Sequence, residues 1–513
     1  MLEVIPRNIM KITFIGAGSV GFTRRLVGDM LMVPELRDAE ITFMDIDEGN
    51  LDRVHQLTQR DIDANGIDIK IEKSLDQREA VRDANYIFCV VRVGGLEAFE
   101  HDINIPLKYG VDQCVGDTLC AGGIMYGQRG IPVILDLCKD IREVAAPDAL
   151  LLNYSNPMAM LTWAANEFGG VDCVGLCHGV QGGHKQIATA LDIPPEELDY
   201  ICAGINHQTW FIQLKHQGRL IGKEELLKAY ENHEKFSKSE KLRIDMLRRF
   251  GAYSTESNGH LSEYLPWYRK RDDEILNWMD PEFGWANGET GGYLRICQES
   301  RGWFKTDFPN WLKEPPKDYS KLEERSHEHG SRIVEALETG RIYRGHFNRV
   351  NGGTIINLPA DCIIEAPGYV DANGINMTLV GNLPLGCAAV CQNSVNVQRL
   401  SVHAAVSGDI ELLRQAMLLD PLVSAICTPP EVWQMTDEML VALAPWLPQW
   451  KDEAGKAKRR LEKGPSVSTR EDFNGAVRFK TATMEELAER AEETRKLTAQ
   501  SDQTDAEKKE AKV

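Results

Sequence analysis

The sequence contains no uninterrupted apolar run of about 20 residues, the length that a helix needs to cross a membrane. It also lacks an excess of basic residues, since 58 lysines and arginines stand against 77 aspartates and glutamates, for a formal net charge of −19. This balance argues against nucleic acid and anionic membranes as partners, and it favours solubility. It leaves room for an anionic small molecule bound at a local basic site.

Paired cysteine motifs are absent as well. The twelve cysteines are scattered singly, with no C-x-x-C spacing, and residues 1–10 lack the apolar core of a signal peptide. We therefore expect free thiols and a cytoplasmic location, where the surroundings are reducing. The chain has 513 residues, 43% hydrophobic and 26% charged, which predicts one large domain or two to three ordinary ones. No internal repeat is present.

A glycine motif lies near the N-terminus between two predicted elements. Gly16, Gly18 and Gly21 have the G-x-G-x-x-G spacing, after a buried-strand pattern and before a helical pattern of apolar residues. In dinucleotide-binding folds the first glycine permits a tight turn, the second lets the backbone approach a pyrophosphate, and the third allows close packing of helix on strand. Ser19 and Val20 complete the cofactor-binding turn, and the amino terminus of the helix then faces the phosphates.

The strands around this motif predict a nucleotide-binding domain. A strand at 11–15 precedes the glycines, and a second strand at 41–44 ends in Asp45. An acid at this position is placed for a ribose diol and favours NAD over NADP. A third strand at 86–91 runs into a glycine-rich turn that begins with Arg92, where the far side of the cofactor is expected. A glycine turn without any ligand is the alternative interpretation of the motif.

Two further loops follow predicted strands. The stretch 109–124, which contains Asp117, is richer in glycine and polar residues than an ordinary connection, so it either lines a site or forms a long surface loop. The strand at 149–153 runs into Asn156 and Pro157 and then into a helix. Asn156 is expected to bind a ligand at the carboxyl edge of the sheet, to cap the helix ahead of the proline, or to do both.

Cys177 and His178 lie together at the end of a short apolar run, inside a glycine-rich loop. Three interpretations are open: a nucleophilic thiol with its base, half of a metal site completed by a second histidine, or a buried thiol beside a surface imidazole. Asn206 and His207 follow further along the chain, again after an apolar run.

Five motifs carry a family resemblance: the glycine motif at 16–21, GDT at 116–118, NYSNPM at 153–158, CH at 177–178 and GINH at 204–207. In this order they resemble family 4 of the glycoside hydrolases, the NAD- and Mn²⁺-dependent α-galactosidases (melibiases), α-glucosidases, α-glucuronidases and phospho-glycosidases. The likeness covers residues 10–450 and is closest to the α-galactosidases, through CHGVQG at 177–182 and the segment from TES to histidine at 255–260. Gly179 stands where melibiases are expected to have serine, and where glucosidase and glucuronidase members have glycine.

The resemblance implies that Cys177 and His207 hold a divalent metal, Mn²⁺, with several positions left open for substrate hydroxyls. His178 is implied as the acid, because it stands where phospho-glycosidase members have an aspartate. For the same reason a 6-phospho sugar is not the favoured substrate. Either His260 or Tyr264 is implied as the base, and the sequence does not separate the two.

Asn156 and Asp117 are implied as substrate-binding residues. Arg92 is a further candidate, because the carboxylate of a uronic acid would need a cationic partner. Arg129 also lies near the implied site loops, so a uronide substrate stays open.

The reaction implied by the resemblance is hydrolysis of α-galactosides by oxidation and elimination. NAD⁺ takes hydride from C3, the metal acidifies the C2 proton, a base removes it, the glycosidic oxygen leaves, and water and hydride return. α-Glucuronidase, galacturonidase or α-glucosidase activity within the family remains open. Outside it, the alternatives are an NAD-dependent dehydrogenase of a sugar or hydroxy acid, and a non-enzymatic NAD-binding regulator.

The predicted fold class is α/β. A Rossmann-like NAD-binding domain is expected over residues 10–205, followed over 206–450 by an α+β domain with helices and antiparallel strands for catalysis and oligomerisation. Residues 344–348 and 351–359 are expected to pair as a hairpin. A homodimer or homotetramer is expected for the family, with the apolar stretch 355–358 as one candidate contact surface.

The C-terminal part is predicted as follows. Helices are expected at 395–405 and 410–419, and the packed region is expected to end at 445–448. The charged residues 451–513 are expected to form a partly disordered extension without a catalytic role, with a solvated helix at 484–498 that binds a partner in the alternative interpretation.

Overall fold

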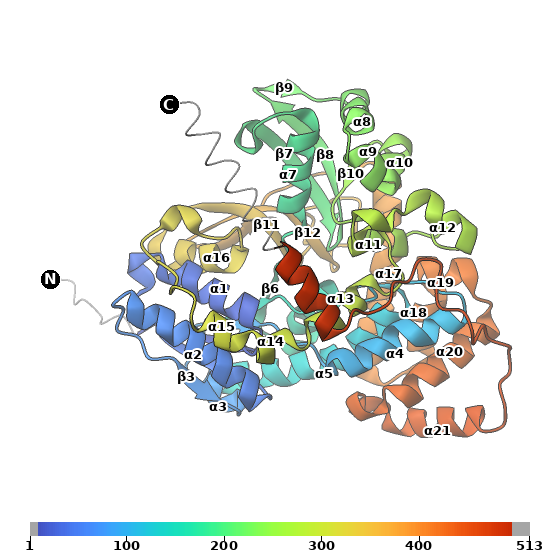
Figure 1. Ribbon diagram of the computed structural model, residues 1–513, viewed down its shortest axis with the longest axis horizontal. Coiled ribbons are helices and arrows are strands. Elements are labelled where there is room, and N and C mark those ends of the chain that lie inside the picture. The colour runs from blue at the N-terminus through green and yellow to red at the C-terminus, as the bar shows by residue number, and fades with distance from the viewer. Residues whose placement is uncertain (1–8, 495–513) are drawn as a thin grey trace.

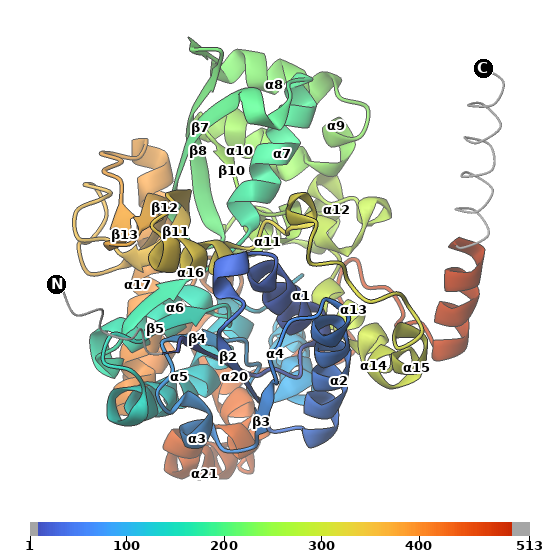
Figure 2. The same ribbon diagram turned by 90° about the vertical axis from the view of Figure 1, so that its left-hand side faces the viewer.

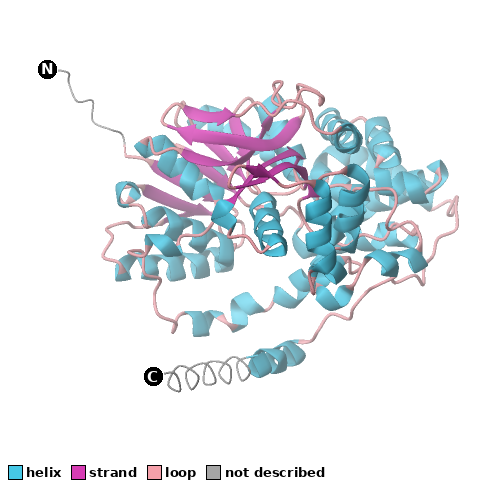
Figure 3. Ribbon diagram, turned by 90° about the horizontal axis from the view of Figure 1, so that it is seen from above, coloured by secondary structure: helices cyan, strands magenta, loops and turns pink. Residues whose placement is uncertain are grey.

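The structure of the protein is a computed structural model that describes residues 9–494 (Figure 1). One mixed sheet runs through these residues, with helices packed around it (Figure 3). The parallel half of the sheet has the order β6-β5-β4-β1-β2-β3, which is that of a doubly wound dinucleotide-binding fold. The predicted α/β fold class is therefore confirmed. The six parallel strands are β1 (Lys11–Ile15), β2 (Glu40–Met44), β3 (Glu72–Ser74), β4 (Tyr86–Cys89), β5 (Leu150–Asn153) and β6 (Asp172–Gly175).

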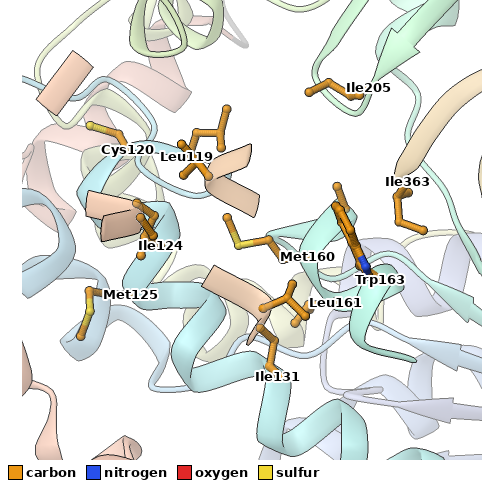
Figure 4. Close-up of a cluster of buried hydrophobic side chains, with 14 of the residues drawn as sticks. Leu119, Cys120, Ile124, Met125, Ile131, Met160, Leu161, Trp163, Ile205 and Ile363 are labelled. Atoms are coloured by element: carbon orange, nitrogen blue, oxygen red, sulfur yellow. The ribbon is translucent and has the colours of Figure 1, made fainter. Parts of the chain in front are cut away.

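Alternate side chains of these strands enter two separate cores, because successive residues of a strand point to opposite faces of the sheet. Phe14 and Phe88 pack on one face, among residues of the first helix. Ile87 and Leu151 pack on the other face, among residues of two long helices, α5 and α17. Figure 4 shows part of this second core, with Trp163 among its side chains. The first-half helices are α1 (Val20–Leu31), α2 (Glu48–Ala64), α3 (Gln77–Val81), α4 (Gly95–Lys108), α5 (Cys120–Val144), α6 (Met158–Ala164) and α7 (Gly179–Leu191).

Two antiparallel hairpins extend the sheet beyond β6. The first consists of β7 (Leu198–Ile205) and β8 (Gln208–His216), and the second of β11 (Tyr343–Val350) and β12 (Ile363–Asp371). The second hairpin lies between β6 and β7 and so joins the two halves. The expected domain boundary at residue 205 falls at the turn of the first hairpin, in a sheet that continues across it. The short strands are β9 (Arg219–Leu220), β10 (Tyr253–Ser254) and β13 (Gly374–Met377).

The expected strand at 351–359 is wrong, because β11 pairs with β12 further along the chain. The Asn351 amide donates to the carbonyls of Ile355, Leu358 and Pro359, and its oxygen accepts from the N–H of Ile355. These bonds satisfy backbone groups that a strand ladder would otherwise pair. The segment is therefore a loop closed by one asparagine.

Most helices of the second half lie around the antiparallel strands or below the parallel ones, and two short helices at 303–311 lie beside α2 (Figures 1 and 2). Between the hairpins lie α8 (Lys223–Asn232), α9 (Phe236–Ser239), α10 (Lys241–Phe250), α11 (Asn258–Glu263), α12 (Asp272–Trp278), α13 (Gly292–Ser300), α14 (Trp303–Thr306), α15 (Phe308–Trp311) and α16 (His329–Thr339). After the second hairpin come α17 (Leu385–Ser407), α18 (Ile410–Leu419), α19 (Pro421–Ile426), α20 (Pro429–Ala442) and α21 (Lys451–Leu461). The helices predicted at 395–405 and 410–419 lie within α17 and α18. No helix of the described residues is both long enough and apolar enough to span a bilayer.

The packed region does not end at 445–448, as expected from the sequence. Helix α21 follows, and its Ala457 is fully buried. The chain then returns to the first half, where the N–H of Ala476 donates to the carboxylate of Asp112 at 2.9 Å. Helix α21 is highly charged, but alanines on one of its faces allow it to pack against the rest of the protein. The charge pattern of the sequence does not reveal this buried face. A last helix occupies 484–494; residues 495–498 of the predicted helix, and most of residues 1–10, lie outside the described residues.

Candidate dinucleotide and metal sites

Two adjoining cavities lie at the carboxyl edge of the parallel strands. The larger, of about 540 Å³, is bordered by the glycine turn and Asp45, and the smaller, of about 400 Å³, by Cys177 and His207. Ser19 and Arg92 line both. Ligands of open α/β sheets bind at this edge, so a two-part ligand can span the cavities with its centre at the glycine turn.

The first two glycines of the motif are required by close approaches of the backbone. Gly16 has φ +84°, and an ideal Cβ there would lie 2.9 Å from the carbonyl group of Val90. A Cβ on Gly18 would lie 2.7 Å from Oδ2 of Asp45, which accepts the Gly18 N–H at the same distance. Because Val20 begins α1, the turn directs the amino terminus of a helix toward the cavity, a favourable place for phosphate.

The third glycine does not have its expected packing role. No atom lies within 4 Å of an ideal Cβ on Gly21, and the residue is exposed. The expectation that Gly21 allows close helix–strand packing is therefore wrong, because it lies on the open side of the first turn of α1. Beyond Asp45, the larger cavity is bordered by Ile46, whose side chain is 92% exposed and offers an apolar surface to a ligand.

Three potential metal-ligand atoms converge from separate parts of the fold. Cys177 follows β6, His207 lies in the turn between β7 and β8, and Glu256 follows β10. One ligand atom from each lies within 4.8 Å of the other two. Asp117, His207 and His260 form a second such group, so His207 belongs to both.

Hydrogen bonding determines which nitrogen of His207 bears the proton. Nδ1 of His207 lies 2.8 Å from the hydroxyl of Thr118, and that hydroxyl donates its single proton to Oδ1 of Asp117, also at 2.8 Å. The Thr118 oxygen must therefore accept from Nδ1–H. Nε2 of His207 is left with a free lone pair, as a metal ligand requires.

Burial raises the pKa of the Cys177 thiol, and the carboxylates of Glu256 and Glu365 raise it further. Burial also disfavours the charged form of Glu256, but the positive charges that His207, His260 and His178 bear when protonated lower its pKa overall. A divalent cation would stabilise both the thiolate and the carboxylate. The donor set of sulfur, nitrogen and oxygen thus fits a borderline divalent metal.

Asn156 and Asp117, both predicted to bind substrate, contact each other. The Asn156 amide donates to Oδ2 of Asp117 at 2.9 Å, and Asn156 lines the smaller cavity. The expected helix-capping role of Asn156 is wrong, since α6 has Pro157 at its N-cap position. Its side chain instead links the loop of Asp117 to the end of β5.

The two candidate bases differ in their surroundings. The ring of His260 lies 5.3 Å from that of His207, and its Nδ1 is 2.7 Å from the hydroxyl of Ser257. Burial lowers the pKa of His260, which keeps the imidazole neutral. Tyr264 is only 1% exposed, and burial, with the charges of Asp117 and Glu263, raises its pKa well above the ordinary value. His178 is exposed at the start of α7 and lines the smaller cavity.

Arg92 and Arg129 have unlike environments. The guanidinium of Arg92 lies over the rings of Phe99, Tyr126 and Tyr293, at 4.5, 5.2 and 5.3 Å from their centroids. Among the described residues no carboxylate forms an ion pair with it. Arg129 makes a bidentate ion pair with Asp102, at 2.8 and 2.6 Å, and both side chains are buried. Arg92 therefore offers a positive charge to the cavity, and Arg129 does not.

Sequence patterns single out neither Glu256 nor the role of Thr118. Glu256 is 79 residues from Cys177, so no local spacing connects them. The one local signal is polar density, because Glu256 belongs to a stretch rich in serine, asparagine and histidine.

Comparison with known proteins gives matches over most of the chain. A family model described as "Family 4 glycosyl hydrolase" matches residues 11–193, and its C-terminal domain matches 202–423. An α-galactosidase of Rhizobium meliloti (strain 1021) is 60% identical over 490 residues, covering 95% of this chain and 99% of that protein. An α-galactosidase of Bacillus subtilis (strain 168) is 33% identical over 446 residues, covering 86% of this chain and 100% of that protein. A crystal structure of a 6-phospho-α-glucosidase from gut microorganisms, in complex with NAD and glucose-6-phosphate, superposes with a TM-score of 0.70 at 25% identity, covering 86% and 99% of the two chains.

Proposed function

The chain belongs to family 4 of the glycosyl hydrolases, and from this premise we propose that it hydrolyses α-galactosides with the help of NAD and a divalent metal, Mn²⁺. The observation that supports galactose as the sugar is the 60% identity to an α-galactosidase over nearly the full length of both chains. The glycine turn and the cluster around His207 support the choice of cofactors.

The larger cavity fits a dinucleotide. Side chains at positions 16 and 18 would collide with the carbonyl group of Val90 and the carboxylate of Asp45, so glycines keep this turn tight. Ser19 and Val20 then present the start of α1 to the cavity, where a pyrophosphate would bind. Asp45 lies on the wall of the same cavity, where its carboxylate can accept hydrogen bonds from ribose hydroxyls.

The cluster around His207 fits the metal. Cys177 and His207 would hold it, because a ligand atom of each lies within 4.8 Å of the other and both residues line the smaller cavity, where a sugar could reach the ion. When bound, the dinucleotide supplies reversible hydride transfer at C3 of the sugar, and the metal supplies Lewis acidity at the neighbouring sugar oxygens.

Residues of this chain supply the proton transfers and the orientation of the sugar. His260 removes the proton from C2, since its imidazole is neutral and adjoins the His207 cluster, whereas Tyr264 is enclosed in the core with a raised pKa. His178, on the wall of the smaller cavity, donates a proton to the departing glycosidic oxygen. Asn156 and Asp117 hold sugar hydroxyls through their linked amide and carboxylate.

A second candidate substrate is a uronide of the same family, a glucuronide or galacturonide. The observation in its favour is the free guanidinium of Arg92 in the cavity wall, which would pair with a sugar carboxylate. Arg129 does not support it, because Asp102 already neutralises that charge. An α-glucoside remains the further alternative.

We also propose a homodimer or homotetramer that works in the cytoplasm. Of the surface expected at 355–358, Ile355 is buried, but Ile356 is 62% exposed. The N–H of Ile356 bonds to Gly381, close to Leu379 and Leu385, which are 70% and 84% exposed. Exposed apolar side chains on these two linked segments favour contact with a second copy. All twelve cysteines are unpaired, which suits a reducing compartment.

The proposal is tested with nitrophenyl α-galactoside, α-glucoside, α-glucuronide and α-galacturonide, in the presence of reductant and with or without NAD⁺ and Mn²⁺. We expect nitrophenol release from the α-galactoside only when both cofactors are present, without net NADH. NADH accumulation on a free sugar acid, with no nitrophenol from any glycoside, would instead identify a dehydrogenase. Release mainly from a uronide would select the second candidate.

A further inference from the structure

Gly179 and Glu256 occupy complementary space. An ideal Cβ on residue 179 would lie 1.6 Å from Oε1 of Glu256, far inside any non-bonded contact. Gly179 is the first residue of α7, directly after the Cys177–His178 pair, and its N–H donates to the Cys177 sulfur at 3.5 Å. The carboxylate of Glu256 therefore reaches Cys177 only because position 179 has no side chain.

Glu256 is held in an unfavourable backbone conformation at this place. Its φ is +67°, in the left-handed region, which is unfavourable for a residue other than glycine. His207 has the same kind of conformation, with φ +61°. Strain of this kind persists where the surrounding structure needs the side chain in one position, and here both residues direct a ligand atom into one cluster.

The Glu256 carboxylate has no N–H partner among the described residues. Its one hydrogen bond is with the Cys177 thiol, at 3.8 Å between Sγ and Oε1. The carboxylate of Asp117, in the neighbouring group of candidates, is by contrast engaged at both oxygens, by Thr118 and by Asn156. A half-buried carboxylate whose one donor is a weak thiol, beside the imidazole of His207, is incomplete without a cation.

We propose that Glu256 is a third protein ligand of the divalent metal, beside Cys177 and His207, and that Gly179 is the residue that admits it. This inference rests on the proposed metal site. Thiolate and carboxylate together balance the charge of a divalent ion, and a carboxylate oxygen makes the site harder than a thiolate–imidazole pair alone, which suits Mn²⁺. Coordination positions remain for the oxygens of the sugar.

The test is a titration of the full-length protein with Mn²⁺, under reducing conditions and without NAD or substrate. Electron paramagnetic resonance measures the concentration of free Mn²⁺ at each step. We expect Glu256→Gln and Gly179→Ala each to weaken Mn²⁺ binding at least about tenfold. The double variant should be no weaker than the single ones, because both changes remove the same contact. Gly182→Ala is the matched control, since it lies in the same helix with no atom within 4 Å of its Cβ. It should bind Mn²⁺ as the wild type does.

The outcomes separate this inference from the proposed function. If Cys177→Ser and His207→Ala abolish Mn²⁺ binding but Glu256→Gln keeps the wild-type affinity, the inference is wrong and the proposed metal site stands. If the wild type binds no Mn²⁺, or the Cys177 and His207 variants bind it unchanged, the proposed site itself fails. Should Gly179→Ala not fold, Glu256→Gln and Glu256→Asp decide alone. Partial recovery in Glu256→Asp supports direct ligation.

Discussion

The hydroxyl oxygen of Thr118 lies 2.8 Å from Nδ1 of His207, and the same hydroxyl donates to Asp117. Thr118 thus makes Nδ1 the protonated nitrogen of His207 and leaves Nε2 free. It links the glycine-rich loop after α4 to the turn between β7 and β8, two segments 89 residues apart in sequence.

Thr118→Val should weaken Mn²⁺ binding about 10- to 100-fold, because His207 loses the acceptor that sets its tautomer and ring orientation. Thr118→Ser keeps the hydroxyl and should restore most of the affinity. Both are measured by Mn²⁺ titration, with thermal unfolding followed in parallel. An affinity in Thr118→Val equal to that of wild type would show that the hydroxyl does not orient the ligand.

Asp45 should determine the choice between NAD⁺ and NADP⁺. Its carboxylate lies on the wall of the larger cavity and would repel a 2′-phosphate. We expect the wild type to prefer NAD⁺ in a calorimetric binding experiment, and Asp45→Ala to lose most of this preference. The neighbouring exposed acid Glu48 provides a control, because Glu48→Ala should leave the preference intact. An unchanged preference in Asp45→Ala would show that Asp45 does not contact the ribose of the cofactor.

The buried ion pair of Asp102 and Arg129 should be important for stability. Arg129 also donates to the carbonyl of Val93, in the turn that borders the larger cavity. Asp102→Ala leaves a buried guanidinium without a counter-ion, so the free energy of unfolding should fall by about 3–5 kcal/mol. The double variant Asp102→Leu, Arg129→Met removes both charges and should recover much of this loss. Urea unfolding measures both, and equal losses in the two variants would contradict the account.

His346 should make the protein sensitive to acid. Burial, with the nearby positive charges of His329 and Arg344, lowers the pKa of His346 to about 3. Since an unfolded histidine has a pKa of about 6.5, the unfolded chain takes up the proton first as the pH falls. The contribution of neutral His346 is therefore intact above pH 6.5 and is lost at about 1.4 kcal/mol per pH unit below it.

The variant for this prediction is His346→Phe, which keeps an aromatic ring against Tyr200, whose centroid is 5.4 Å away. Between pH 6.5 and 5 the wild type should lose about 2 kcal/mol more unfolding free energy than the variant. Denaturant midpoints at the two pH values give this difference directly. Parallel pH profiles for the two proteins would mean that His346 does not titrate between the folded and unfolded states.

The sequence predicted those parts of the site that depend on local order. A strand, a glycine turn, a helix and a second strand ending in Asp45 are contiguous, so their pattern predicts both the doubly wound order and the cavity beside Gly16 and Gly18. The convergence of Cys177 and His207 was expected only from the family resemblance. The structure adds a physical reason for it, because both residues follow strands of one sheet.

Features that depend on tertiary contacts were missed or mistaken. Glu256 follows a strand of only two residues and itself has a left-handed backbone conformation, which directs its side chain to the cluster. No pattern in the sequence predicts that conformation. Asn351 closes a loop that resembles a strand in composition. The charged segment after residue 450 packs through alanines such as Ala457. These alanines are buried by contact with α20, which the local sequence does not predict.

The measurement that tests the central claim most directly is hydrolysis of an α-galactoside in deuterated water, with NAD⁺, Mn²⁺ and reductant present, followed by proton NMR of the released galactose. If His260 removes the C2 proton during cleavage, that proton exchanges with solvent, and the account predicts deuterium at C2 of nearly every product molecule. Galactose released with its C2 proton intact would contradict cleavage through C2 deprotonation, whatever the cofactor dependence.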